Sequence, residues 1–171
     1  MKILFICHGN ICRSPMAEFV MKKLVQDRKL TEQFFIASAA TRTDEIGNSV
    51  YPPAKRKLAE HGITCEGKRA RQITKADYAE YDLLIGMDSA NIRDMKRLWD
   101  QDPQHKVHLL MEYTDRPGDV ADPWYTGDFE ATWQDVLNGC RGLLAALTKK
   151  RPLKEFLLLC IMFIVLFAEV N

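Results

Sequence analysis

The sequence predicts an α/β fold in which a four-stranded parallel sheet is flanked by helices on both faces. Short apolar runs alternate along the chain with amphipathic stretches at helical spacing, which is typical of βαβ units. The runs are apolar throughout, as in strands that a parallel sheet buries on both faces. A chain of 171 residues fits one domain, which we assign to residues 1–150, with residues 151–171 as an apolar C-terminal tail.

The strands are identified by their short apolar runs. Residues 3–7 read ILFIC, with no polar side chain apart from the thiol, and residues 81–86 read YDLLIG. Runs of this length, bounded by turn residues, are typical of buried strands. In chain order, the strands are expected over residues 3–7, 34–38, 81–86 and 107–110.

The helices are identified by apolar stripes and by the residues at their ends. Pro15 suits a first helical position, because it fixes φ and lacks an N–H that would be unpaired there. Thr74 is a candidate N-cap, as are Asp88 and Ser89, and Gly62 is a stop signal. The helices are expected over residues 15–29, 54–61, 74–80, 89–99 and 129–147.

Charge and cysteine usage limit the class of protein. The 24 Lys and Arg residues nearly balance the 23 Asp and Glu residues, for a net charge of +1, which argues against a nucleic-acid partner. The cysteines are odd in number and irregular in spacing, and no signal peptide precedes the first strand. We therefore expect a cytoplasmic protein with free thiols. The cysteines are Cys7, Cys12, Cys65, Cys140 and Cys160.

The tail contains a run of thirteen uncharged apolar residues, 156–168. As a helix with a rise of about 1.5 Å per residue it would reach about 20 Å, against about 30 Å for the hydrocarbon core of a bilayer. Three interpretations stay open: a helix packed on the domain, a membrane-surface anchor helped by the basic residues 149–151, or a stretch without a role in the chemistry.

The end of the first strand carries the residues with the most chemistry. Cys7 is followed six residues later by Arg13, at the start of the first helix. If the loop between them curls, the N–H groups of residues 8–13 converge and suit a tetrahedral oxyanion such as phosphate. Gly9 and Asn10 are the residue types that best tolerate the positive φ such a loop needs.

The same positive potential favours the thiolate form of the Cys7 sulfur, which is a strong nucleophile. Ser14 is placed to donate a hydrogen bond to that sulfur. Arg13 can bind two phosphate oxygens at once, which a lysine does less well. From these residues alone two interpretations of Cys7 stay open, a nucleophile in a phosphate site and a small apolar core residue at a strand end, whereas a zinc site lacks a second ligand pair at a suitable spacing.

Several segments together resemble the low-molecular-weight protein tyrosine phosphatases. CHGNICRSP is similar to the phosphate-binding loop of that family, and the resemblance spans about the first 148 residues. It continues, in the family's order, through ASAAT at 37–41, KRARQIT at 68–74, MDSANIRD at 87–94 and DPWYTGDFE at 122–130.

The resemblance implies the fold of that family and hydrolysis of protein phosphotyrosine and small aryl phosphates through a cysteinyl-phosphate. It implies a phosphotyrosine-containing protein as substrate, inorganic phosphate or a similar oxyanion as site ligand, no metal or cofactor, and a monomer or weak dimer. It places the acid opposite the guanidinium across the bound ester. Catalysis is assigned to Cys7, Arg13 and Asp122, the last as general acid and base, and substrate binding to His8, Gly9, Asn10, Ile11, Cys12, Ser14, Trp124 and Tyr125.

The chain departs from the family at two places. Residues 41–45 contain no aromatic side chain to form one wall of the pocket, and Tyr51 is a candidate substitute. Lys68 stands where the family tends to have histidine, and we assign it no catalytic role. The family also implies a reversible disulfide between Cys7 and Cys12 under peroxide.

Three alternative functions stay in view. Protein-arginine phosphatases share the resemblance, but they carry Thr at the place of Ile11 and small residues at the places of Trp124 and Tyr125. Thiol-coupled arsenate reductases need a cysteine pair near residues 80–90, which read EYDLLIGMDSA. A module that only binds phosphate would need neither a nucleophile nor an acid.

Overall fold

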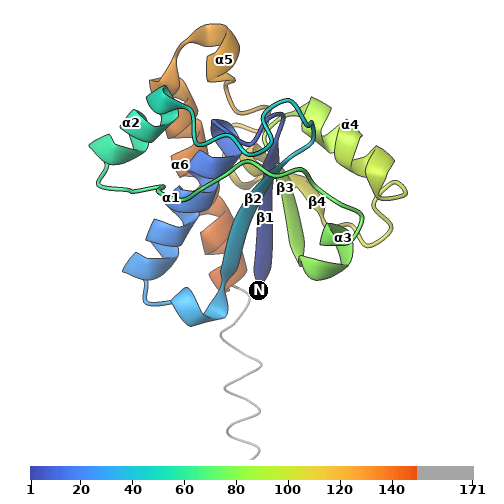
Figure 1. Ribbon diagram of the computed structural model, residues 1–171. Helices are drawn as coiled ribbons and strands as arrows, with labels where there is room; N and C mark the ends of the chain where they lie inside the picture. The colour runs from blue at the N-terminus through green and yellow to red at the C-terminus, as the bar shows by residue number, and fades with distance from the viewer. Residues whose placement is uncertain (150–171) are drawn as a thin grey trace, which may run out of the picture.

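The computed structural model describes residues 1–149, in which the chain forms one parallel sheet covered by helices on both faces (Figure 1). The strands are β1 (Lys2–Cys7), β2 (Phe35–Ala40), β3 (Leu83–Gly86) and β4 (Val107–Leu109). The helices are α1 (Arg13–Asp27), α2 (Pro52–Glu60), α3 (Asp77–Glu80), α4 (Ser89–Leu98), α5 (Pro123–Thr126) and α6 (Phe129–Lys149), with 3₁₀ turns η1 (Thr31–Gln33) and η2 (Leu110–Tyr113).

The strand order is β2-β1-β3-β4, and every pairing is parallel. The chain leaves β1 for β2 on one side and later returns to β3 on the other side of β1. In open parallel sheets, ligands bind in the crevice outside the carboxyl ends of the strands, where the order reverses in this way. The topology therefore points to the carboxyl end of β1, where Cys7 lies. The predicted fold class is confirmed.

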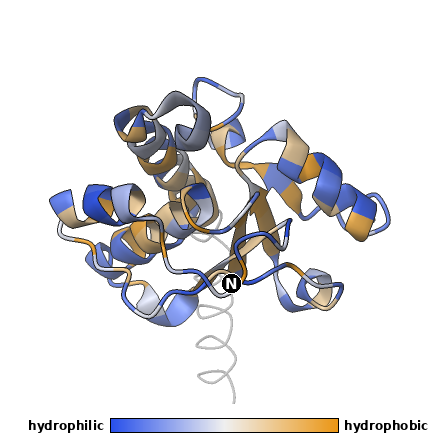
Figure 2. Cartoon of the chain, turned by 45° about the horizontal axis from the view of Figure 1, so that its top comes forward, coloured by the Kyte–Doolittle hydropathy of each residue, from blue (hydrophilic) through white to orange (hydrophobic). Residues whose placement is uncertain are grey.

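Alternate residues of β1 bury their side chains in two different cores. Ile3 and Phe5 belong to the core under α1, α2 and α6, whereas Leu4 and Ile6 belong to the core under α3 and α4. All four side chains are fully buried, which explains why the strand reads as an unbroken apolar run. In Figure 2 the central strands are coloured as hydrophobic, while the surrounding helices mix hydrophobic and hydrophilic residues.

Both ends of the described chain lie at the amino end of the sheet (Figure 1). Met1 donates from its terminal amino group to the Gln33 carbonyl oxygen at 2.7 Å. The final turns of α6, which ends at Lys149, reach the same end, whereas α5 lies beyond the carboxyl ends of the strands. No helix within residues 1–149 is long and apolar enough to cross a membrane. The apolar run of residues 156–168 lies outside the described residues.

Two local predictions were wrong, and one short helix was not predicted. α1 begins at Arg13, so Pro15 is its third residue; the first N–H groups of a helix have no partner in it, so proline fits there too. Thr74 is not the cap of α3, because its N–H and hydroxyl both donate to Asp77, whose carboxylate folds back over the turn. α5, four residues long within a turn-rich segment, was not predicted.

Candidate active site

The loop after β1 wraps around the Cys7 sulfur. The Asn10 N–H donates to Sγ at 3.3 Å, and the Ser14 hydroxyl lies 3.1 Å from Sγ. Asn10 has a φ of 57°, as the loop was predicted to require, whereas Gly9 is not among the residues with positive φ. A Cβ on Gly9 would lie 3.0 Å from Cγ of Glu45, so glycine here allows the loop to pack closely against the Glu45 side chain.

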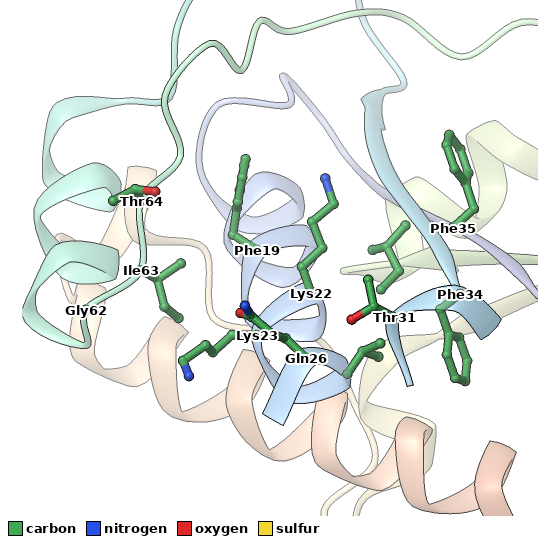
Figure 3. A pocket seen from close by; sticks show the side chains of 12 residues that line it. Phe19, Lys22, Lys23, Gln26, Thr31, Phe34, Phe35, Gly62, Ile63 and Thr64 are labelled. Atoms are coloured by element: carbon green, nitrogen blue, oxygen red, sulfur yellow. The ribbon is translucent and has the colours of Figure 1, made fainter. Parts of the chain in front are cut away.

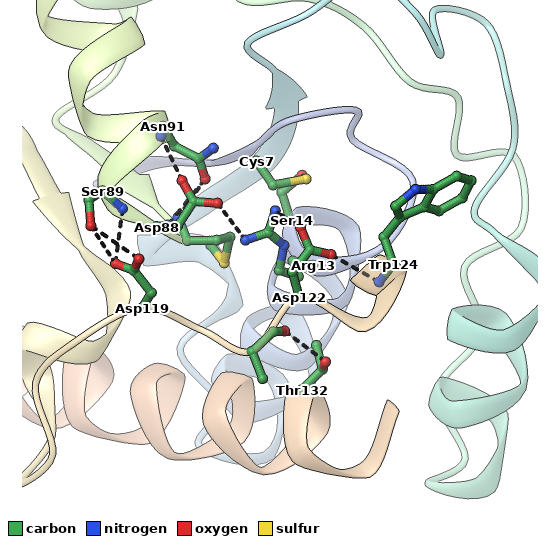
Figure 4. A network of polar contacts seen from close by, with 12 residues as sticks. Cys7, Arg13, Ser14, Asp88, Ser89, Asn91, Asp119, Asp122, Trp124 and Thr132 are labelled. Atoms are coloured by element: carbon green, nitrogen blue, oxygen red, sulfur yellow. Dashed lines mark hydrogen bonds and ion pairs between the residues drawn. The ribbon is translucent and has the colours of Figure 1, made fainter. Parts of the chain in front are cut away.

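The Arg13 guanidinium lies beside Cys7 and is held by two carboxylates. Its Nη1 donates to Oδ2 of Asp88 at 2.6 Å, and its Nη2 is 2.5 Å from Oδ2 of Asp122. Burial on its own would lower the pKa of Arg13, but negative charge on Cys7, Asp122 and Asp88 outweighs burial and raises it. Figure 4 shows the sulfur, the guanidinium and Asp122 close together.

Asp88 uses its two carboxylate oxygens for different tasks. Oδ1 accepts from the Asn91 N–H at 2.7 Å and so caps α4, as predicted, while Oδ2 holds Arg13. The Asn91 side-chain oxygen accepts in return from the Asp88 N–H at 3.2 Å, which completes a capping box. Asp88, at the N-terminus of α4, thereby holds the Arg13 side chain at the start of α1.

The segment that carries Asp122 is fastened on both sides. The Val120 N–H donates to the Met87 carbonyl oxygen, 2.8 Å away, just after β3. The Thr132 hydroxyl of α6 donates to the Ala121 carbonyl oxygen at 2.8 Å. Asp122 then caps α5 by accepting from the Trp124 N–H at 3.0 Å (Figure 4). These contacts bring residue 122 over the loop of residues 8–13.

A cleft of about 440 Å³ lies above the sulfur. Trp124 and Tyr125 line one side of it and are 62% and 86% exposed, so their rings are available to a ligand. The ring of Tyr51 is 5.8 Å from that of Trp124 and 6.1 Å from that of Phe129. Tyr51 thus supports Trp124 from behind and is not a wall of the cleft.

The facing side of the cleft is charged. His8 Nε2 lies 3.2 Å from Oδ2 of Asp44, and Arg42 Nη2 lies 2.9 Å from Oδ2 of Asp94. Arg42 and Asp44 belong to the segment of residues 41–45, which lacks an aromatic residue. A flat ring in the cleft would therefore meet aromatic side chains of residues 124 and 125 and polar or charged side chains of residues 42 and 44.

Cys12 caps the start of α1 without a side-chain hydrogen bond and is buried in the loop. Burial, with smaller contributions from charge on Cys7 and Asp122, raises the pKa of Cys12 to about 12. Cys12 is therefore a neutral thiol near pH 7. Cys65 and Cys140 are buried in the core under α1 and α6, as expected of packing residues.

A second hollow, of about 500 Å³, lies between α1, β2 and the segment after α2 (Figure 3). Its lining includes Phe19, Lys22, Phe34, Phe35 and Ile63 but no thiol, imidazole or carboxylate. It shares no lining residue with the cleft above Cys7. Among residues 1–149 no group of three or more His, Cys, Asp or Glu side chains is arranged to hold a metal ion.

The structure brings the three predicted catalytic side chains together in one cleft. Of the eight predicted substrate-binding residues, Asn10 and Ser14 contact the sulfur and are not among the residues that line the cleft. The sequence did not identify Asp88 as a partner of Arg13, because it shows only that Asp88 follows a predicted strand and not that this strand lies beside β1. The other six line the cleft: His8, Gly9, Ile11, Cys12, Trp124 and Tyr125.

Comparisons with known proteins agree with this geometry. The model of the family described as low molecular weight phosphotyrosine protein phosphatase matches residues 2–153. The mouse protein of that name is 41% identical over 147 residues, which cover 83% of this chain and 92% of the mouse protein.

Solved structures give the same picture. The structure of YfkJ from Bacillus subtilis is similar with a TM-score of 0.85 and 34% identity, over 89% of this chain and 97% of that one. The structure of a Drosophila arginine phosphatase is similar with a TM-score of 0.80 and 28% identity, over 86% of this chain and 98% of that one. The chain belongs to the low molecular weight phosphotyrosine protein phosphatase family.

Proposed function

We propose that this protein hydrolyses protein phosphotyrosine and small aryl phosphates through a cysteinyl-phosphate. The observation that carries the proposal is the meeting of a thiol, a guanidinium and a carboxylate at the carboxyl end of β1. The Asn10 N–H donates to the Cys7 sulfur, the Ser14 hydroxyl lies 3.1 Å from it, and Arg13 and Asp122 are in contact in the same cleft. A site built only to hold phosphate would need no nucleophile and no acid.

The first half-reaction transfers the phosphoryl group to sulfur. The Cys7 thiolate attacks phosphorus, the bond from phosphorus to the phenolic oxygen breaks, and protonated Asp122 gives its proton to that oxygen. A phenolate leaves poorly without this proton, because its conjugate acid has a pKa near 10. Arg13 and the amides of residues 8–13 meet the charge on the transferring group, so that the scheme requires no metal ion.

The second half-reaction restores the enzyme. Water attacks phosphorus, Asp122, now a carboxylate, takes a proton from that water, and the bond from phosphorus to sulfur breaks. The Ser14 hydroxyl, 3.1 Å from Sγ, is placed to stabilise the thiolate that leaves. Inorganic phosphate is the product and is expected to inhibit competitively.

The test is a side-by-side assay of phosphotyrosine, phosphoserine and phosphoarginine peptides with the wild-type enzyme and with Cys7→Ser. We expect turnover of phosphotyrosine alone, no turnover by Cys7→Ser, and retained phosphate binding by that variant. An active Cys7→Ser enzyme would overturn the assignment of the nucleophile.

Arginine dephosphorylation is the second candidate, because a Drosophila arginine phosphatase is among the similar structures. The lining of the cleft favours tyrosine: Ile11 is apolar, and Trp124 and Tyr125 present flat aromatic surfaces to a phenyl ring. Preferential turnover of the phosphoarginine peptide in the same assay would reverse this order.

A further inference from the structure

Each of the three residues before the candidate general acid is bound by a different part of the molecule. Asp119 accepts from the Ser89 N–H at 2.9 Å and from the Ser89 hydroxyl at 2.8 Å, at the start of α4 (Figure 4). The N–H of Val120, which is 2% exposed, donates to the Met87 carbonyl oxygen. Ala121 is bound by side chains of α6. The acid therefore follows directly after a segment that is held at every residue.

Two side chains of α6 bind both polar backbone groups of Ala121. The Ala121 N–H donates to Oδ2 of Asp135 at 3.0 Å, and the Thr132 hydroxyl donates to the Ala121 carbonyl oxygen at 2.8 Å. The same hydroxyl also lies 3.2 Å from the Asp128 carbonyl oxygen, which is the longer of its two contacts. Because residues three apart in a helix lie on the same face, a single face of α6 holds Ala121.

These two hydrogen bonds act on the two peptide groups that precede Asp122. The Ala121 N–H belongs to the peptide group that joins residues 120 and 121, and the Ala121 carbonyl belongs to the one that joins residues 121 and 122. Because a peptide group is planar, a hydrogen bond to its carbonyl oxygen also restrains the Cα atom that follows. Thr132 thereby restrains the point from which the Asp122 side chain extends.

The Asp135 carboxylate has a separate partner for each of its oxygens. Oδ2 accepts from the Ala121 N–H, while Oδ1 is in contact with Nη2 of Arg116. The side chain of Asp135 is 10% exposed and that of Arg116 is 72% exposed, so the arginine binds the carboxylate from the solvent side. Asp135 therefore links two places in the segment between η2 and α5.

Thr132 and Asp135 are polar residues on the buried face of a helix. Thr132 is fully buried and Asp135 nearly so, whereas other buried residues of α6, such as Val136 and Leu143, are apolar. Aspartate is almost never fully buried unless it is paired, and both residue types have a low helix propensity. Packing alone would favour apolar residues at these two positions, so the bound backbone of Ala121 accounts for their presence.

We propose that Thr132 and Asp135 are positioning residues for the general acid: they hold the peptide groups before Asp122 so that its carboxylate reaches the oxygen of the leaving group. The inference rests on the proposed function, in which Asp122 protonates that oxygen. Neither Thr132 nor Asp135 lines the cleft above Cys7, so both act through the backbone of Ala121 and not on the substrate.

The reach of the acid is sensitive to small displacements. Proton transfer needs a separation of about 2.6–3.2 Å between the two heavy atoms, and a misplacement of about 1 Å can cost about 10²-fold in rate. Loss of one hydrogen bond at Ala121 leaves the contacts of Asp119 and Val120 in place. We therefore expect single substitutions to weaken the action of the acid without abolishing it.

The test compares two substrates that differ in their need for the acid. The phenolic oxygen of a phosphotyrosine peptide must be protonated as it leaves, whereas that of a nitrophenyl phosphate need not be. Thr132→Val removes the hydroxyl and keeps the branched shape of the side chain. We expect its kcat to fall about tenfold for the phosphotyrosine peptide and by less than about twofold for nitrophenyl phosphate.

Asp135→Ala removes the acceptor of the Ala121 N–H and is expected to show the same selective loss. Two conservative variants keep the hydrogen bonds: Thr132→Ser retains a hydroxyl, and Asp135→Asn retains a carbonyl oxygen that can accept from the N–H. Both are expected to restore the wild-type ratio of the two kcat values. A selective loss in Thr132→Ser and Asp135→Asn as large as in the first two variants would overturn the proposal.

The matched control is Gln134→Ala. Gln134 lies between the two residues in the sequence but on the exposed side of α6, where its Nε2 donates to Oε1 of Glu130 at 2.7 Å. We expect wild-type kcat values for both substrates. A selective loss in this variant would show that α6 as a whole, and not the two side chains, controls the acid, which would contradict the proposal.

Hydrogen exchange tests the contact with α6 without any substrate. The Ala121 N–H, followed by NMR, is expected to exchange slowly in the wild type and at least about tenfold faster in Asp135→Ala. Fast exchange of this N–H in the wild type would overturn the proposal, whatever the variants show.

Failure of the inference and failure of the proposed function can be told apart. A wild type that turns over neither substrate would overturn the proposed function, while the exchange rates would still decide whether α6 holds Ala121. A wild type that turns over both substrates, with equal losses on the two in Thr132→Val and Asp135→Ala, would leave the proposed function standing. Thr132 and Asp135 would then only support the fold, and the inference would be wrong.

Discussion

The Arg13 guanidinium and the Asp122 carboxylate are in direct contact, with Nη2 and Oδ2 2.5 Å apart. The residue proposed to bind phosphate and the residue proposed to protonate the leaving group therefore neutralise each other. We expect a phosphate that binds Nη2 to displace Asp122 and free it for the ester oxygen, while Asp88 stays bound to Nη1. Under the proposed function, substrate binding and placement of the acid are then one exchange of partners.

In Asp122→Asn the side chain can still cap α5, but an amide cannot donate a proton to the leaving group. We expect turnover of a phosphotyrosine peptide to fall by about 10²- to 10⁴-fold, with a much smaller loss for a nitrophenyl phosphate, whose leaving group needs no protonation. Steady-state kinetics with both substrates measure the difference.

The matched control for this variant is Asp128→Asn, since Asp128 accepts from the Ala131 N–H at the start of α6, away from the cleft. Equal losses on both substrates in Asp122→Asn would show that Asp122 only supports the loop.

Substitutions at Asp88 separate its two tasks. Asparagine caps helices about as well as aspartate, so Asp88→Asn is expected to retain stability but to weaken competitive inhibition by phosphate roughly tenfold, because Arg13 loses its charged anchor. Asp88→Ala is expected to lose, in addition, about 1 kcal/mol of unfolding free energy. Denaturant unfolding and inhibition assays check the two effects. Tighter phosphate inhibition in Asp88→Asn would mean that Asp88 competes with phosphate for Arg13.

Gly142 allows α6 to approach η2. A Cβ at this position would lie 1.9 Å from the Tyr113 carbonyl oxygen, which belongs to the backbone and cannot move alone. Gly142→Ala is therefore expected to lower the unfolding free energy by at least about 2 kcal/mol, in the upper range for overpacking. The control is Arg141→Ala on the exposed side of the same helix; similar thermal midpoints for the two variants would contradict the close contact.

The stability of the fold is expected to depend on pH through Glu18. Its pKa is lower in the folded protein than the ordinary 4.5, since Lys68, Lys22 and Ser38 outweigh burial. A depressed folded-state pKa gives stabilisation that is present above the ordinary value and is lost as the pH falls through the folded-state value.

Thermal midpoints measured between about pH 6 and about pH 3 should therefore fall less steeply in Glu18→Gln than in the wild type. Asp27→Asn, which removes an exposed pair, serves as the comparison and is expected to follow the wild type. A Glu18→Gln curve parallel to the wild type would contradict the assignment.

The sequence predicted the sheet because β1 is buried on both faces, so that its residues 3–7 form an unbroken apolar run. Cys7 could be placed for the same reason, since it ends the apolar run, and the predicted helix start at residue 15 is two residues from the observed start at Arg13. Asp88 showed its capping role in the sequence, but its contact with Arg13 depends on β3 lying beside β1, which no local pattern encodes.

α5 escaped prediction because a four-residue helix has no periodicity, and its cap, Asp122, had already been assigned to catalysis. The structure places the Asp122 carboxylate in contact with the Arg13 guanidinium, and the placement of Asp122 across a bound ester stays a prediction. Tyr51 was considered as a pocket wall, but its ring packs behind Trp124.

The termini of the described chain lie at the amino end of the sheet (Figure 1), whereas the cleft is lined by Cys7 and other residues at the carboxyl end. A fusion partner, affinity tag or surface tether joined at Met1 or following Lys149 would consequently begin on the side remote from the Cys7 sulfur. An enzyme immobilised through Met1, or through a linker that follows Lys149, would therefore keep its cleft on the side turned away from the support.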